Sequence, residues 1–355
     1  MRLISGVRTV LAVLIPMASA LAQSPPQSAP ESPDVKISLD WAFQGPESAF
    51  LYGAQKGEFT RRGLNVQLDR GNATTDTIVR VASGAYQFGW ADIATMVKFN
   101  AENPDKALIA VYVTGGNSPL AIVSVAGRGI KKPTDLAGRT LGSAAGSAAF
   151  ALFPLFASAT GFDASTIHWK LLGGALREPM MVRGDVDAIA GFTQSTVWSV
   201  VELGVPIDKI VVFRYNDFGI RQYGTAFLVR PDYARANPRT VRAVVAALNA
   251  SEKDAIANPV ASVASILARD PLANLANECL RLVDTLKTQT LTDEFKTKGL
   301  STVNPARLEQ SMDELLRAFH LPAKVAADTV FDPSFLPPEA ERIPPPLGAC
   351  TPKPS

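Results

Sequence analysis

Residues 34–68 read DVKISLDWAFQGPESAFLYGAQKGEFTRRGLNVQL and decide the fold class. Alternating apolar residues predict a strand at 35–39, and a second strand is predicted at 65–68. Residues 48–62 between them predict a helix, and Gly63 stands directly after its basic end, where a C-cap belongs. A strand, a helix and a strand in this order are typical of a parallel α/β sheet.

The same alternation continues along the chain and then starts again, which predicts two α/β lobes of similar construction. Repeated prolines from Pro333 onward predict a tail without helix or central strand. The other strands are predicted at 86–90, 108–114, 121–125, 139–142, 168–172, 188–192, 210–215 and 225–230, and the other helices at 74–83, 93–100, 241–257, 260–268 and 305–320.

The N-terminus has the features of a signal peptide. Arg2 and Arg8 precede a short apolar stretch, Val10 to Ile15, and the small-residue site Ala20-Leu21-Ala22 follows it. We therefore expect residues 1–22 to be cleaved near Ala22 and the mature protein to be periplasmic, with no membrane anchor. Residues 23–33 are rich in Ser and Pro and predict a flexible linker.

Composition argues against a nucleic-acid partner, and it leaves open whether the two cysteines form a disulfide. The formal charge is +2 over 355 residues, with acidic and basic residues interspersed, so nucleic acid is not an expected partner. Cys279 and Cys350 are the two cysteines of the chain. An exported protein permits them to form a disulfide, but the sequence does not show their separation, so paired and free thiols both remain open.

The sequence contains no recognisable catalytic constellation. His168 and His320 are its two histidines, and neither has a neighbouring cysteine or acidic cluster, so neither a metal site nor a cofactor is expected. Nucleophile-elbow, phosphate-loop and zinc-protease motifs are absent from the sequence. We therefore expect a binding protein rather than an enzyme.

Candidate ligand-binding residues lie where strands end, which is where open α/β sheets bind ligands. Ser143 and Ser147 belong to a Gly-rich run that follows a strand and opens a helix. Such a run can bind a polar or anionic ligand, but either serine could equally be a plain N-cap of the helix. The other candidates are aromatic side chains suited to stacking or polar groups suited to hydrogen bonding: Trp41, Phe192 and Tyr223, and Glu47, Asp92, Asn117 and Glu178. Arg177 is suited to pairing with an anion, although a solvated surface charge is the default for it.

Several motifs resemble periplasmic solute-binding proteins for nitrate, taurine, alkanesulfonates and thiamine pyrimidine precursors. They are Leu39-Asp40-Trp41, Gly63-Leu64-Asn65-Val66, Ala82-Ser83-Gly84, Phe88-Gly89-Trp90-Ala91-Asp92 and Asp135-Leu136-Ala137-Gly138. The resemblance spans residues 34–335. It implies a type II periplasmic-binding-protein fold, with a first lobe of residues 34–117 and 225–335, a second lobe of 118–224, a hinge of two crossings and a Pro-rich tail at 336–355. It also adds Gln44 and Ser83 to the candidates by position.

The resemblance implies a monomeric receptor that passes a small ligand to an ABC permease and its ATPase. The ring-rich cleft favours an aromatic or heteroaromatic nutrient such as a thiamine pyrimidine precursor, and a sulfonate, taurine or nitrate anion is the alternative. A sensor kinase in place of the permease would keep the same fold. A pyrimidine-synthesising enzyme is the alternative of another class, but Glu47 stands where those relatives carry a histidine.

Overall fold

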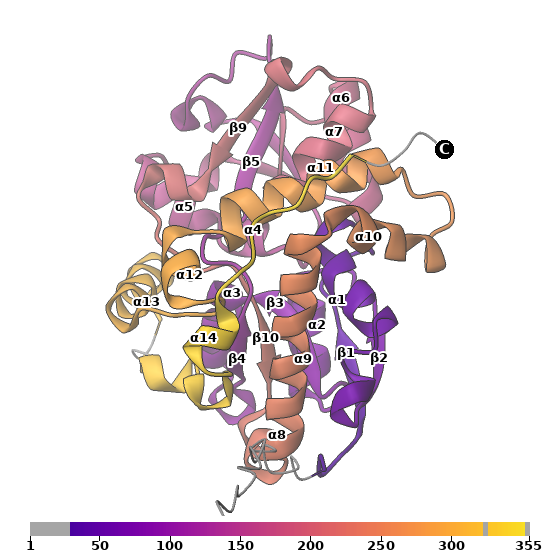
Figure 1. Ribbon diagram of the computed structural model, residues 1–355. Coiled ribbons are helices and arrows are strands. Elements are labelled where there is room, and N and C mark those ends of the chain that lie inside the picture. Colours follow the sequence, from indigo (N-terminus) through magenta and orange to yellow (C-terminus); the bar gives the residue numbers. More distant parts are fainter. Residues whose placement is uncertain (1–28, 322–325, 352–355) are drawn as a thin grey trace, which may run out of the picture.

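The computed structural model describes residues 29–321 and 326–351, and the predicted signal peptide lies outside them. The chain forms two five-stranded sheets surrounded by helices, one in the lower half of Figure 1 and one in the upper half. The first sheet has the order β2-β1-β3-β10-β4, with β1 (Asp34–Ser38), β2 (Asn65–Asp69), β3 (Phe88–Asp92), β4 (Ile109–Val113) and β10 (Thr225–Val229). The second has the order β7-β6-β8-β5-β9, with β5 (Leu120–Val125), β6 (Thr140–Ser143), β7 (His168–Leu171), β8 (Ala188–Phe192) and β9 (Ile210–Arg214).

In each sheet one strand runs against the other four. β1 pairs in parallel with β2 and β3, while β10 is antiparallel to β3 and β4. In the second sheet β6 pairs in parallel with β7 and β8, and β5 is the antiparallel strand. Both faces of the central strands are covered: every residue of β3 and of β10 is buried, as expected for strands with near-continuous apolar runs.

Fourteen helices of the described residues cover the sheets. They are α1 (Gly45–Gln55), α2 (Thr74–Ala82), α3 (Ile93–Glu102), α4 (Ala148–Ala151), α5 (Phe153–Thr160), α6 (Arg177–Arg183), α7 (Thr193–Glu202), α8 (Pro231–Ala236), α9 (Pro238–Ala257), α10 (Pro259–Ala264), α11 (Leu275–Thr285), α12 (Asp293–Lys298), α13 (Pro305–Phe319) and α14 (Glu339–Arg342). Within the two described stretches, none of these helices has the length and apolar character needed to cross a membrane.

Two predicted elements differ from the structure. The helix predicted at 48–62 is α1, which begins earlier because Pro46 suits the first helical turn, and ends before Gly57, whose φ is 81°. Gly63 instead caps a 3-10 turn at Thr60–Arg62. The tail was predicted to hold no helix, yet α14 forms in it, where good helix formers follow Pro337 and Pro338.

Each sheet has its own aromatic packing within the core. In the first, Phe50 of α1 contacts Trp90 and Phe227 edge-on, with ring centroids 5.4 and 4.8 Å apart. In the second, Phe156 of α5 stacks on Tyr215 at 4.7 Å. Such pairs add to the free energy of apolar burial in both halves of the molecule.

The chain passes between the two sheets twice, and the two crossings lie side by side. The Gly224 amide donates to the Gly115 carbonyl at 2.8 Å, and the Thr114 amide donates to the Thr225 carbonyl at 2.9 Å. A Cβ on Gly115 would lie 3.0 Å from the Gly224 Cα, so a side chain there would push the crossings apart. The predicted division into lobes at 117 and 225 coincides with these crossings and remains a prediction.

The C-terminal tail is tied to α11. Cys279, buried on that helix, and Cys350 form a disulfide with their Cα atoms 5.6 Å apart, across 71 residues of sequence. Of the two outcomes left open by the sequence, the structure has the paired one. Figure 1 shows the tail running from α14 along the molecule to α11, which lies between the two halves.

Candidate functional site

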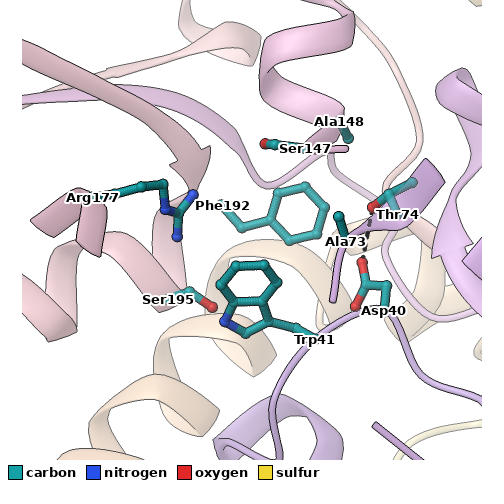
Figure 2. A pocket seen from close by; sticks show the side chains of 9 residues that line it. All are labelled: Asp40, Trp41, Ala73, Thr74, Ser147, Ala148, Arg177, Phe192 and Ser195. Atoms are coloured by element: carbon teal, nitrogen blue, oxygen red, sulfur yellow. Dashed lines mark hydrogen bonds between the residues drawn. The ribbon is translucent and has the colours of Figure 1, made fainter. Parts of the chain in front are cut away.

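A cavity lies between the two sheets, beyond the carboxyl ends of β1, β6 and β8. About 30 Å³ of it is open to the centres of water-sized molecules, so in this arrangement of the two halves it is smaller than typical ligand pockets. Figure 2 shows the side chains that line it, which come from both halves of the molecule. They are Asp40, Trp41, Ala73, Thr74, Ser147, Ala148, Arg177, Phe192 and Ser195.

The cavity lining comes from strand ends and from the starts of helices. Asp40 and Trp41 follow β1, and Thr74 opens α2. In the other half, Ser147 precedes α4 and Phe192 ends β8 directly before α7. Helix N-termini present backbone N–H groups, so this cavity offers polar contacts around an apolar centre.

Trp41 forms one aromatic wall of the cavity, and Arg177 holds it. The Arg177 guanidinium lies 5.1 Å from the centroid of the Trp41 ring. It donates to the Ala190 carbonyl at 3.0 Å and to Glu178 Oε1 at 3.0 Å, and it is only 4% exposed. Because its charge is paired with Glu178 inside the protein, Arg177 acts as a support for the ring.

Asp40 places a buried carboxyl group at the cavity. The residue is 3% exposed, and Thr74 Oγ1 donates to its Oδ2 at 3.0 Å. Burial raises the pKa of Asp40 to about 7, the hydrogen bond from Thr74 acts to lower it, and the charge of Asp92 raises it further. A carboxyl group with a pKa close to neutral pH, placed in a partly apolar cavity, is suited to binding hydrogen-bond donors.

A larger polar groove adjoins the cavity. About 580 Å³ of it is open to the centres of water-sized molecules, and it shares Trp41, Arg177 and Ser195 with the cavity, so these three side chains separate the two spaces. The groove carries charged side chains of both signs: Arg70, Glu178, Glu202, Asp270, Glu278 and Arg281.

Hydrogen bonds join the two halves on opposite sides of the cavity. Ser195 Oγ donates to Gln44 Oε1 at 2.9 Å on one side. On the other, the amide and hydroxyl of Thr75 both donate to the Gly146 carbonyl at 3.2 Å. The structure therefore shows the two halves in contact around the cavity.

Arg281 of α11 adds a buried ionic link between the halves. It is 2% exposed, donates to Glu278 Oε1 at 3.1 Å, and reaches α7 through the Ser195 carbonyl at 3.0 Å and Glu202 Oε2 at 3.2 Å. Glu278 also accepts from the Gly45 amide at 2.6 Å. Through this pair, α11 connects the start of α1 with α7.

Five of the predicted site residues lie at these spaces. Trp41, Ser147 and Phe192 line the cavity, and Gln44 and Glu178 line the groove, which Trp41 also borders. Their position supports a ligand-binding role, which remains a prediction.

Three other candidates are buried outside the cavity and groove linings, and each has an oxygen that is hydrogen-bonded to the backbone. Glu47 accepts from the Gln44 amide at 3.1 Å, and Asp92 caps α3 by accepting from the Thr95 amide at 2.8 Å. Burial raises the pKa of Asp92 to about 6, and burial together with the charge of Asp40 raises the pKa of Glu47 well above its usual value. The Ser143 hydroxyl donates to the Ala144 carbonyl at 3.2 Å.

The remaining three candidates lie elsewhere in the fold. Ser83 is exposed at the end of α2, where its hydroxyl donates to the Arg80 carbonyl. Asn117 belongs to the first crossing and donates to the Thr288 carbonyl at 3.1 Å. Tyr223 is buried beside the second crossing and donates to Glu294 at 3.1 Å. None of the three belongs to the cavity or groove lining.

Sequence reasoning missed six residues of the cavity lining, namely Ala73, Ala148 and four polar ones. Asp40 was quoted only as part of a motif, Arg177 was assigned by default to the surface, and Thr74 and Ser195 were not considered. Thr74 and Ser195 each fall within the first three residues of a helix that follows a strand, a position that could have signalled them. Among residues 29–321 and 326–351, no group of three or more His, Cys, Asp or Glu is placed to hold a metal ion.

The two sheets, the paired crossings and the cavity between them define a type II periplasmic-binding-protein fold. Solved structures share it. The alkanesulfonate-binding protein SsuA from Xanthomonas axonopodis pv. citri, bound to MOPS, is 17% identical with a TM-score of 0.66, over 85% of this chain and 99% of that one. The aliphatic sulphonate binding protein SsuA from Escherichia coli is 16% identical with a TM-score of 0.63, over 91% and 94%.

A nitrate-binding protein has the same fold. NrtA from Synechocystis PCC 6803 is 13% identical with a TM-score of 0.64, over 86% of this chain and 88% of that one. By sequence, residues 46–262 match the family model described as NMT1/THI5 like. The chain belongs to this family. The sequence matches none of the curated proteins with which it was compared.

Proposed function

We propose that this chain is a non-enzymatic, periplasmic solute receptor that binds a small flat heteroaromatic ligand bearing N–H donors and passes it to an ABC permease and its ATPase. An aminopyrimidine related to the thiamine precursors is the ligand class we favour. The fold and family membership support the receptor role, and the cavity supports the ligand class.

The observation that carries the ligand class is the buried carboxyl group of Asp40 beside two aromatic rings. Trp41 from one half and Phe192 from the other present apolar surface to the cavity (Figure 2). An aromatic ligand stacks on such side chains, and its ring N–H or amino group donates to Asp40. Thr74, Ser147 and Ser195 supply further polar contacts around the ring.

A sulfonate, taurine or nitrate ligand is the alternative, and the charges at the cavity disfavour it. Arg177 is the cation among the lining residues, and its guanidinium is already bonded to Glu178 and to the Ala190 carbonyl. An anion would also approach the Asp40 carboxyl group, whose ionised form repels it.

A thermal-shift screen with cytosine, the hydroxymethyl pyrimidine precursor of thiamine, taurine and nitrate tests the proposal. A ligand that binds the folded state raises the melting temperature by mass action, so we expect the two pyrimidines to raise it and the two anions to leave it unchanged. A shift with taurine or nitrate alone would replace the proposed ligand class with the anion alternative.

Two variants then test where the ligand binds. Asp40→Leu removes the acceptor for a charge-assisted hydrogen bond, so we expect an affinity loss of about 10- to 100-fold. Trp41→Ala removes a stacking surface, and a loss of similar size is expected. Asp105→Asn, in an exposed turn after α3, is the matched control and should leave the affinity unchanged. Full affinity in both cavity variants would place the ligand elsewhere.

The transport partner needs its own test. Purified receptor added to vesicles that hold a candidate ABC permease and its ATPase should stimulate ATP hydrolysis when the pyrimidine is present. Stimulation of a neighbouring sensor kinase, with no effect on the ATPase, would support the sensor alternative instead.

A further inference from the structure

Two glycines of the second half contact the first half at the edges of the cavity. We propose that Gly146 and Gly174 are specificity-determining positions that set how closely the two halves approach, and that they thereby limit the ligand to a single small ring. The inference rests on the proposed function only in taking the cavity as the ligand site.

Gly174 lies against the ring of Trp41. A Cβ built on Gly174 would stand 2.4 Å from Trp41 Cη2 and 2.9 Å from Cζ2, closer than real Cβ atoms approach other heavy atoms. The Arg177 guanidinium lies over the ring at 5.1 Å and is itself bonded to Glu178 and Ala190, so it limits movement of the ring toward that side. Any side chain at Gly174 therefore requires the halves to separate or the Trp41 wall to be displaced.

Gly146 makes the corresponding contact across the cavity. Its Cβ would stand 2.8 Å from the Ala73 Cβ and 2.5 Å from Thr75 Oγ1. The Ala73 Cβ is fixed to the backbone directly before α2 and has no rotamer to change. In addition, the Gly146 carbonyl accepts both Thr75 hydrogen bonds, which hold the two surfaces together.

Both contacts affect the size of the same cavity, because Trp41 and Ala73 both line it. With a hydrogen atom at Gly146 and Gly174, the halves approach until about 30 Å³ of the cavity remains open to the centres of water-sized molecules. A methyl group at either position acts as a spacer, which widens the cavity and exposes the Asp40 carboxyl group to water. The expected result is weaker binding of one-ring ligands and a relative gain for ligands with two fused rings.

A cross-linking rate measures closure without any ligand. Cysteines replace Gln44 and Ser195, whose side chains meet across the cavity at 2.9 Å, and the short bifunctional reagent dibromobimane joins them. The native cysteines are held in a disulfide and do not compete for the reagent. Because the reagent traps the closed arrangement whenever it forms, the rate reports its population even when that population is small.

Gly174→Ala and Gly146→Ala are each expected to slow cross-linking about tenfold, the effect of a typical overpacked contact. Gly173→Ala is the matched control: its Cβ would meet only Leu176 Cδ1, at 3.9 Å, so the rate should stay at that of the parent. Equal rates in all three variants would overturn the inference, as would a parent protein that does not cross-link.

Affinities for cytosine and adenine provide the second measurement, because both carry an amino group beside a ring nitrogen and differ in ring size. Gly174→Ala should lower the ratio of cytosine affinity to adenine affinity. If neither base binds and the cross-linking rates still differ as expected, the proposed ligand class fails and the closure contacts stand. If both bases bind with an unchanged ratio, the contacts do not determine specificity.

Discussion

Asp40→Asn should stabilise the protein at pH 8 far more than at pH 5. Burial raises the pKa of Asp40 to about 7 from the ordinary 3.8. Between these two values the folded protein binds a proton that the unfolded chain releases, so the contribution of Asp40 to the free energy of unfolding falls as pH rises. Above pH 7 the ionisation of Asp40 lowers the free energy of unfolding by on the order of 4 kcal/mol. On the order of 3 kcal/mol of this loss arises between pH 5 and pH 8.

Asparagine has nearly the same shape and does not titrate, so it removes this dependence while Thr74 keeps an acceptor. Urea unfolding of wild type and Asp40→Asn at both pH values measures the difference. The exposed variant Asp105→Asn should follow the wild-type curve at both. If Asp40→Asn lowered the free energy of unfolding at pH 8, the carboxyl group would be stabilised as an anion in the fold, and our account of the cavity would be refuted.

Other predictions concern the links between elements. Replacing Cys279 and Cys350 together by serine removes a cross-link across 71 residues, and the loop-entropy model gives a loss of about 4 kcal/mol in the free energy of unfolding; reductant should produce the same shift in wild type and none in the variant. Arg281→Met leaves Glu278 buried without its partner and should cost about 3 to 5 kcal/mol by urea unfolding, while adding Glu278→Gln should restore part of the loss. Phe50→Ala opens a cavity among the aromatic rings of the first half and should cost about 3 to 5 kcal/mol, and a cost below 1 kcal/mol would contradict the packing described.

The strands were the easiest part of the fold to predict from the sequence. Buried runs such as Leu120–Val125 and Thr225–Val229 are apolar at all but one position each, and this pattern depends only on burial. The helix α7 was missed because its sequence, TQSTVWSVVE, is rich in β-branched and hydroxyl residues that favour strands or turns. The helix packs against α11 and against strands β5, β8 and β9, and local sequence preference does not show such contacts.

The location of the site could be predicted from the sequence, whereas the roles of most individual side chains could not. Trp41 and Phe192 stood out because large aromatic residues followed strand ends. The spacing of Gln44 and Glu47 is that of a helix N-terminal capping pair, and this could have warned that Glu47 serves α1. The role of Arg177, on α6, depends on the carbonyl of Ala190 in β8, so no local pattern in the sequence contains it.

The adjacent crossings make the second sheet and its helices an insertion in the first half. Because the Gly115 carbonyl and the Gly224 amide are bonded at 2.8 Å, the chain leaves and re-enters the first half at a single point. All the strands of the second sheet lie between these two residues. The intervening segment can therefore be exchanged as a cassette for the corresponding part of a relative, with only two junctions to design, both at one place in the fold.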